Sequence, residues 1–207
     1  MADIFNGDVT ITGNLKVNGD KPLYARTELI QDDNFRFKIP HTAWRVWDAL
    51  ATNLPGTSAA DDLGLIGGTF GTASPTIQTR DVKALGAVTH YARCQFVLPA
   101  EYVGAQSVTI RARAGMLTTL SDGAATIDFE AYRANDEAGI GSDLVTTAAT
   151  TIKSLTLSNK DFAMSVGTLF PGDTLDIRMA ISITDAATGT AVIGIVGSVE
   201  MLLDIKG

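Results

Sequence analysis

The sequence predicts an all-β protein: an antiparallel β-sandwich of jelly-roll type with a short N-terminal β arm. Three observations lead to this prediction. Apolar and polar residues alternate with period two over long segments from Gln106 onward, as they do in half-buried strands. Clusters of turn-forming residues separate these segments, and no long amphipathic helix interrupts them. The chain has 207 residues, 45% of them hydrophobic, which suits one medium-sized domain with an appendage.

The first segment, residues 1–22, is predicted to be a β arm used for assembly or docking. In its stretch NGDVTITGNLKVNGDKP the apolar residues, all at odd positions, are Val9, Ile11, Leu15 and Val17. One extended strand, or a hairpin with a three-residue loop, would place them on one face. So few apolar side chains do not offset the entropy of ordering a lone strand or hairpin in water. The stripe therefore needs a partner surface, which is the chain's own body, a symmetry mate or another protein.

The second segment, residues 23–84, is predicted to be a strand, a short helix and a glycine-rich loop that pack on the body. NFRFKIP alternates as a strand does, and GTSAADDLGLIGGTFGTASPT has no regular period. In HTAWRVWDAL the residues at helical spacing are Ala43, Val46, Trp47 and Leu50. Thr42 lies where the cap of such a helix would fall. We interpret Trp44 and Trp47 as core or subunit anchors rather than as a sugar platform.

Residues 85–207 are predicted to form the sandwich body. The segment VTHYARCQFVLP directs inward Val88, Ala92, Cys94, Phe96 and Leu98. His90 falls on the same apolar face, so it is interpreted as a satisfied core or interface histidine rather than a ligand or base. Cys94, the one cysteine, is interpreted as a core thiol, and it allows no intramolecular disulfide.

Further strands are predicted over SVTIRARAGM, TIDFEAY, DFAMSV and TLDIRMAISIT. The last strand is predicted to have six apolar residues in one phase: Ile193, Ile195, Val199, Met201, Leu203 and Ile205. Gly197 interrupts this series at the place where a bulge or bend would fall. The Greek-key order of the strands does not follow from the sequence.

Charge and hydropathy exclude several classes of function. The net charge of −7 and the pI near 4.7 oppose nucleic-acid binding, which needs clustered Lys and Arg. No secretory signal peptide is predicted, because the first residues lack a basic region followed by an apolar one. The longest apolar run is too short for a membrane helix and contains Glu200. We therefore expect neither a nucleic-acid partner nor a membrane anchor.

The motifs that bear on chemistry predict no catalytic, cofactor-binding or metal-binding residue. His41 and His90 lack the spacing of metal ligands. The glycines of GLIGGTFG, Gly64, Gly67, Gly68 and Gly71, lack the Lys and Ser/Thr of a phosphate-binding loop. Asp128 and Glu130 share a strand face, as glycosidase carboxylates do, but we interpret them as solvated charges. The turn from Asn135 to Asp143 is rich in oxygen ligands, and whether it binds an ion such as calcium is left open.

The stretch GDVTITGNLKVNGD resembles the V-x-I-x-G-x-L-x-V-x-G segments near the N-termini of tailed-bacteriophage virion proteins, including capsid decoration proteins and fibres. PHTAWRVWDA, DDLGLIGG, LPAEYVG and FPGDTLDIRM are similar in style to phage jelly-roll structural proteins. The resemblance implies a structural protein that is not an enzyme, made in the host cytoplasm and placed on the capsid surface. The expected role is a trimeric decoration or cement protein that stabilises the head by binding the major capsid protein or another virion protein.

In this reading the trimer or capsid interface includes Val9, Ile11, Leu15, Val17, Trp44 and Trp47. The alternative is a tail or head fibre, a receptor-binding protein that contacts host glycans. A third class, a carbohydrate-active enzyme, would depend on Asp128 and Glu130. No cofactor is expected in the first two.

Overall fold

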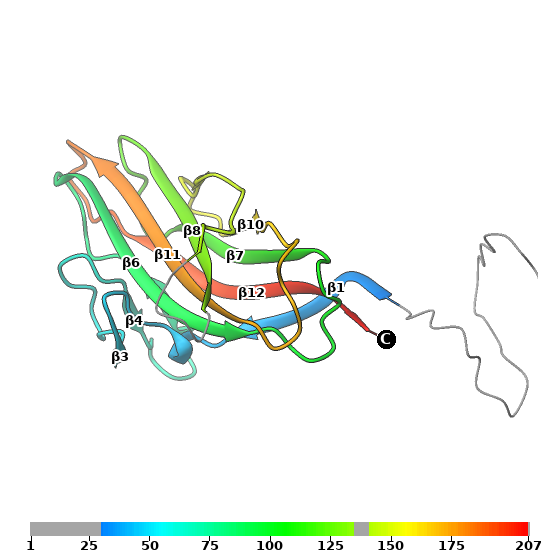
Figure 1. The fold of residues 1–207 in the computed structure, drawn as a ribbon. Helices are drawn as coiled ribbons and strands as arrows, with labels where there is room; N and C mark the ends of the chain where they lie inside the picture. The colour runs from blue at the N-terminus through cyan, green and yellow to red at the C-terminus, as the bar shows by residue number, and fades with distance from the viewer. Residues whose placement is uncertain (1–29, 135–140, 207) are drawn as a thin grey trace, which may run out of the picture.

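The computed structural model describes residues 30–134 and 141–206 as a sandwich of two six-stranded sheets (Figure 1). Sheet A contains β1 (Ile30–Ile39), β4 (Gly64–Ile66), β5 (Thr76–Gln78), β7 (Val108–Met116), β10 (Ser158–Ala163) and β12 (Gly194–Lys206). Sheet B contains β2 (Arg45–Val46), β3 (Ala49–Asn53), β6 (Gly86–Val97), β8 (Ala125–Ala134), β9 (Thr150–Thr151) and β11 (Thr174–Asp185). The predicted all-β class is confirmed.

The strand order is that of a jelly roll. In sheet A, β12 pairs with β7 on one side and with β1 and β5, at different points along its length, on the other. The order β1-β12-β7-β10 in sheet A opposes β6-β11-β8-β9 in sheet B. From β6 to β12 each long strand lies in the sheet opposite its predecessor, so the connections cross the ends of the sandwich as two Greek keys require. Figure 1 shows β1 beginning at the end of the sandwich where β12 finishes.

The core lies between the sheets and is built by strict alternation. Along β11, every second residue from Leu175 to Asp185 is buried and the residues between them are partly or fully exposed. Three rings join the layers: Trp44 contacts Phe129 of β8, and Phe129 meets Phe162 of β10 with 4.9 Å between centroids. Such an edge-to-face pair contributes about 0.5–1.5 kcal/mol beyond the area it buries. The sheets are therefore locked together through aromatic as well as aliphatic contacts.

The predicted inward face of β6 is confirmed. Cys94 is fully buried, and burial raises the pKa of its thiol, so it is a core residue as expected. His90 is also fully buried, but the prediction of a satisfied histidine is wrong. Within the described residues, neither ring nitrogen of His90 has a hydrogen-bond partner. Desolvation and the charge of Arg80 therefore keep the imidazole neutral, and the charge of Asp61 only partly opposes them.

The helix predicted over HTAWRVWDAL does not form. Only His41–Ala43 makes a single 3₁₀ turn, and the chain then runs as β2 and β3. Trp44 and Val46 are buried while Arg45 between them is half-exposed, so the burial period is two rather than 3.6. The apolar residues of this segment fit both a helical spacing and a strand-like alternation. The pairing of Arg45 with Arg93 of β6 selects the strand.

The glycine-rich segment is not entirely a loop. Residues 61–63 hydrogen-bond to Tyr91 of β6 in sheet B, and the chain continues directly as β4 of sheet A. This crossing covers one side of the sandwich. Gly64 is needed there, because a Cβ on it would lie 2.4 Å from the backbone nitrogen of Ser58.

The last strand contains the predicted bulge. Because of this bulge, the prediction of which residues face the core is wrong for the part of the strand before Gly197. The register of β12 against β7 shifts between Val196 and Ser198, at Gly197. Val199 and the odd residues after it face the core as expected. Before the bulge the phase is reversed: a Cβ on Gly194 would meet Ile181 and Ile183 of sheet B, so Ile193 and Ile195 point away from that sheet. One inserted residue exchanges the two faces of a strand.

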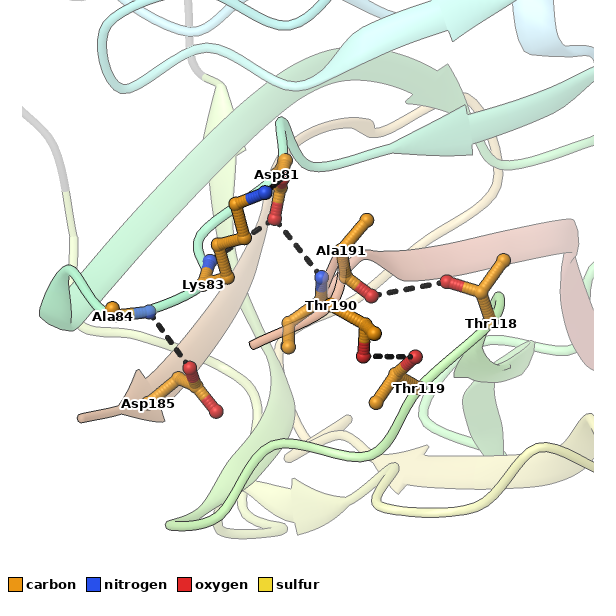
Figure 2. Close-up of polar contacts among 9 residues, drawn as sticks. Asp81, Lys83, Ala84, Thr118, Thr119, Asp185, Thr190 and Ala191 are labelled. Carbon is orange, nitrogen blue, oxygen red and sulfur yellow. Dashed lines mark hydrogen bonds and ion pairs between the residues drawn. The ribbon is translucent and has the colours of Figure 1, made fainter. Parts of the chain in front are cut away.

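A polar network joins three loops at the end of the sandwich where β6 begins and β11 finishes (Figure 2). Asp185 is completely buried, and its carboxylate accepts hydrogen bonds from the backbone nitrogens of Ala84 (2.8 Å) and Asp122 (2.9 Å). Asp81 likewise accepts from the nitrogen of Val192 at 3.0 Å. Desolvation raises the pKa of Asp185, but the hydrogen bonds from the Thr188 hydroxyl and from the nitrogens of Ala84 and Asp122 outweigh it and hold the pKa below its usual range. The network fixes loops that have no ladder of their own.

Several predictions fall on residues that are not described. The arm residues Val9, Ile11, Leu15 and Val17, and most of the Asn135 to Asp143 turn, lie outside the described ranges. The segment 23–84 is described only from Ile30, and its strands belong to the same two sheets as residues 85–207. In the described part of the chain, no helix is long and apolar enough to cross a membrane.

His90 makes the stability of the fold depend on pH. Desolvation lowers its pKa from 6.5 to about 4, and the charge of Arg80 acts in the same direction. Below pH 6.5 the unfolded chain takes up a proton that the folded chain refuses, so the free energy of unfolding falls as the pH drops toward 4. The decrease is at most about 1.4 kcal/mol per pH unit. Thermal melts from pH 7 to pH 5 should therefore show a smaller decline for His90→Leu than for the unchanged protein. Parallel declines would contradict this account.

Candidate functional site

The outward face of sheet B gathers the charged and aromatic side chains of three neighbouring strands. Arg178 on β11 lies opposite Arg93 on β6 and Glu130 on β8. Two residues away on β11, and on the same face, Asp176 lies opposite Gln95 and Tyr132. Alternation places these residues outward because their neighbours are the core residues of the same strands. We call this surface the sheet-B face.

The described residues of the sheet-B face form two ion pairs. Arg93 donates from Nε to Asp176 Oδ1 at 2.7 Å and from Nη2 to the other oxygen, a bidentate pair. Arg178 donates from Nη2 to Glu130 Oε2 at 2.6 Å. The Asp176 side chain is only 13% exposed, so solvent screens the first pair less than an open surface pair. The hydrogen bond to Asp176 raises the pKa of Arg93 further, which keeps the pair ionised.

Two aromatic rings also contact the guanidinium group of Arg178. Its guanidinium carbon lies 4.9 Å from the ring centre of Tyr91 and 5.6 Å from that of Trp47, a double cation–π contact. The two rings contact each other with centroids 5.2 Å apart, and the Trp47 indole nitrogen donates to Asp61 Oδ2 at 3.1 Å. Trp47 is therefore fixed by a ring, a cation and a hydrogen bond.

A groove of about 520 Å³ lies over these residues. Its lining comprises Trp47, Asp48, Arg93, Glu130, Tyr132, Gly141, Asp176 and Arg178. Gly141 belongs to the segment that returns along β8, which Asp143 fixes by accepting from the backbone nitrogens of Ala131 and Val145. The groove thus has an aromatic side chain from the β2–β3 turn, a second from β8, and ion-paired polar groups between them.

Carboxylates dominate the electrostatics around the groove. Burial raises the pKa of Asp128, and the nearby charges of Glu130 and Asp143 add to this effect, while the backbone nitrogen of Phe129 opposes it. Burial and the same two acids raise the pKa of Tyr132. The hydroxyl of Tyr132 therefore stays protonated, and it can donate a hydrogen bond as well as accept one.

The structure places the sequence-predicted residues in different environments. Asp128 and Glu130 share the outward face as predicted, but only Glu130 lines the groove. Trp44 is 1% exposed in the chain's own core, whereas Trp47 is half-exposed on the sheet-B face. The interface role predicted for the two tryptophans stays a prediction, since one chain does not test it. Among the described residues, no group of three or more His, Cys, Asp or Glu is placed to hold a metal ion.

Most of the groove was missed by sequence reasoning. The sequence analysis singles out none of Arg93, Tyr132, Asp176 and Arg178, which lie within segments predicted only as strands. The signal was present, because each is an outward residue of a long strand. Combining them requires knowing that β11 lies between β6 and β8, which one sequence does not reveal.

Comparisons with known proteins give no family for this chain. No protein-family profile and no curated protein matches it. Solved structures with a similar fold include a putative sugar-binding protein from Bacteroides thetaiotaomicron, with a TM-score of 0.43, 8% identity, and coverage of 71% of this chain and 85% of that one.

Two further similar structures are described as xylan-binding. A xylan-binding domain from Paenibacillus barcinonensis has a TM-score of 0.41, 13% identity, and coverage of 70% of this chain and 82% of that one. The xylan-binding module CBM15 has a TM-score of 0.41, 14% identity, and coverage of 84% and 99%. Values this low assign no ligand to this chain.

Proposed function

We propose that this protein is a non-catalytic glycan-binding protein and that the groove on the sheet-B face is its binding site. The observation that carries the proposal is the combination of Trp47 and Tyr132 with two ion pairs in one open groove. A sugar ring has an apolar face of C–H groups and a rim of hydroxyl groups. Aromatic rings match the first, and charged groups held in fixed directions match the second.

Preorganisation supports this proposal. Arg93 and Asp176 orient each other, and Arg178 is held by Glu130 and by the rings of Trp47 and Tyr91. These side chains would lose little rotamer freedom when a ligand binds, so less of the interaction energy is spent on ordering them. Their guanidinium groups donate hydrogen bonds and their carboxylates accept them, which suits hydroxyl groups that can do both.

The geometry favours binding over hydrolysis. A glycosidase needs two carboxyl groups directed at one glycosidic bond. Asp128 turns one oxygen to the backbone nitrogen of Phe129 and does not line the groove, and Glu130 is bonded to Arg178. The two carboxylates share a strand face without sharing a ligand volume.

We further propose that the binding protein is a virion component, and that it acts as a fibre or receptor-binding protein rather than as a decoration protein. The N-terminal resemblance supports the virion, and the groove supports the receptor-binding role. β1 is the first described strand after the arm, and its pairing with β12 from Ile30 to Ile39 ties this end of the chain to sheet A. Trimerisation through the arm would multiply weak glycan contacts.

Removing an aromatic side of the groove should weaken glycan binding. Glycans that bind on an array would be titrated by calorimetry against Trp47→Ala and Tyr132→Ala. Each substitution should raise the dissociation constant about tenfold, since one lost ring contact is worth about 1 kcal/mol or more. Phe170→Ala, which removes a ring that is 53% exposed elsewhere, is the matched control and should bind normally. Normal binding by both groove variants would refute the assignment of the site.

Deleting residues 1–20 should change the assembly state if the arm trimerises the protein. Light scattering is expected to give a trimer for the full chain and a folded monomer for the truncated one, because the apolar stripe then has no partner. The trimer should also dissociate more slowly than the monomer from a surface that carries immobilised glycan, because several binding sites engage at once. The same number of subunits in both proteins would exclude the arm as the oligomerisation element.

A further inference from the structure

The charges that line the groove are unequal. Among the described residues, its lining contains three carboxylates, on Asp48, Glu130 and Asp176, and two guanidinium groups, on Arg93 and Arg178. Both guanidinium groups are paired with carboxylates of the same groove. Asp48 is left as an exposed negative charge at the groove.

We propose that the groove selects neutral glycans and rejects those that carry carboxylate, sulfate or phosphate groups. This inference rests on the proposed glycan-binding function and names the ligand class of the same site. The reason is that an anionic ligand finds no free cation among the described residues of the groove. To form a full ion pair, it would have to displace a protein carboxylate from its arginine.

Displacement is unfavourable at both arginines. Arg93 uses Nε and Nη2 on both oxygens of Asp176, whose side chain is the more buried partner of the pair. Freeing Arg93 would leave that carboxylate poorly solvated and without a counter-charge. Arg178 is held by Glu130 and lies over the rings of Trp47 and Tyr91, so it cannot turn toward an anion without losing these contacts.

Acids beside the groove oppose an anion as well. The Trp47 indole donates to Asp61, and Asp62 follows it in the chain. Burial raises the pKa of Asp62, and the charges of Asp61 and Asp48 raise it further, which shows that these carboxylates lie close enough to repel one another. Like charges brought together across an interface weaken binding and exclude wrong partners.

The neighbouring arginine on β2 does not change this balance. Arg45 pairs beside Arg93 in the register of sheet B. Its Nη1 donates to the carbonyl oxygen of Thr42 at 2.6 Å, and its side chain lines a different hollow with Asn53 and Leu54. It therefore offers no free cation to a ligand in the groove.

The experiment compares matched neutral and charged sugars. β-1,4-linked hexaoses of glucose, mannose, galactose and N-acetylglucosamine would be titrated calorimetrically against the full chain. Each hexaose that binds would be tested again after its primary hydroxyl groups are oxidised to carboxylates. Oxidation should raise the dissociation constant at least about tenfold. Neutral binding should be insensitive to salt, because no ligand charge is present to be screened.

A second variant tests the cause. Glu130→Gln releases Arg178 from its ion pair, so the penalty for the oxidised hexaose, measured as the ratio of the two dissociation constants, should shrink severalfold. Glu101→Gln makes the same chemical change at an exposed residue outside the groove and should leave the ratio as it was.

The outcomes separate the two proposals. Binding of a neutral hexaose with rejection of its oxidised form, and a reduced ratio in Glu130→Gln alone, supports the inference. Equal or tighter binding of the oxidised form overturns the selection for neutral glycans while glycan binding stands. An unchanged ratio in Glu130→Gln overturns the ion-pair explanation. Failure of every hexaose to bind, neutral or oxidised, contradicts the proposed function itself.

Discussion

The position of β11 between β6 and β8 is the constraint on which the rest of the structure depends. Its pairing runs unbroken from Thr174 to Asp185 against β6, and from Thr174 to Ile183 against β8. Because side chains alternate, the same strand supplies the core through residues such as Ile177 and the groove through Asp176 and Arg178. A shift of one residue would bury the charges and expose the core, so the hydrophobic effect fixes the position of the groove side chains.

The groove inherits its rigidity from this register. Arg178 lies directly opposite Glu130, and the diagonal step from Arg93 to Asp176 suits a bidentate pair. Trp47 comes from outside these strands, yet its ring, its indole N–H and the guanidinium beside it are all engaged. The proposed binding surface is therefore built mainly on long strands, and its charged side chains are already held in place before a ligand arrives.

The same alternation explains what could be predicted from the sequence. Long strands such as β7 and β11 were predicted nearly to their ends, because one buried face leaves a clear period. The helix predicted over residues 41–50 was wrong. Trp44 and Val46 have the spacing of a strand, whereas Ala43, Val46 and Trp47 have the spacing of a helix. Only the pairing with β6 decides between the two. The prediction that Ile193 and Ile195 face the core was wrong, because the bulge at Gly197 exchanges the two faces of the strand. The groove could not be predicted, since Arg93, Arg178 and Glu130 are brought together by strand order, which no local pattern reveals.

The central claim is that ligands bind over β6, β11 and β8 and not elsewhere on the sandwich. Amide NMR of the 21.8 kDa chain during titration with a neutral oligosaccharide tests it most directly. The account predicts shifts confined to residues around Trp47, Glu130 and Arg178, with the outer face of sheet A at Arg111 and Glu200 unchanged. Shifts concentrated on sheet A or at the loop ends, with the sheet-B face silent, would contradict it.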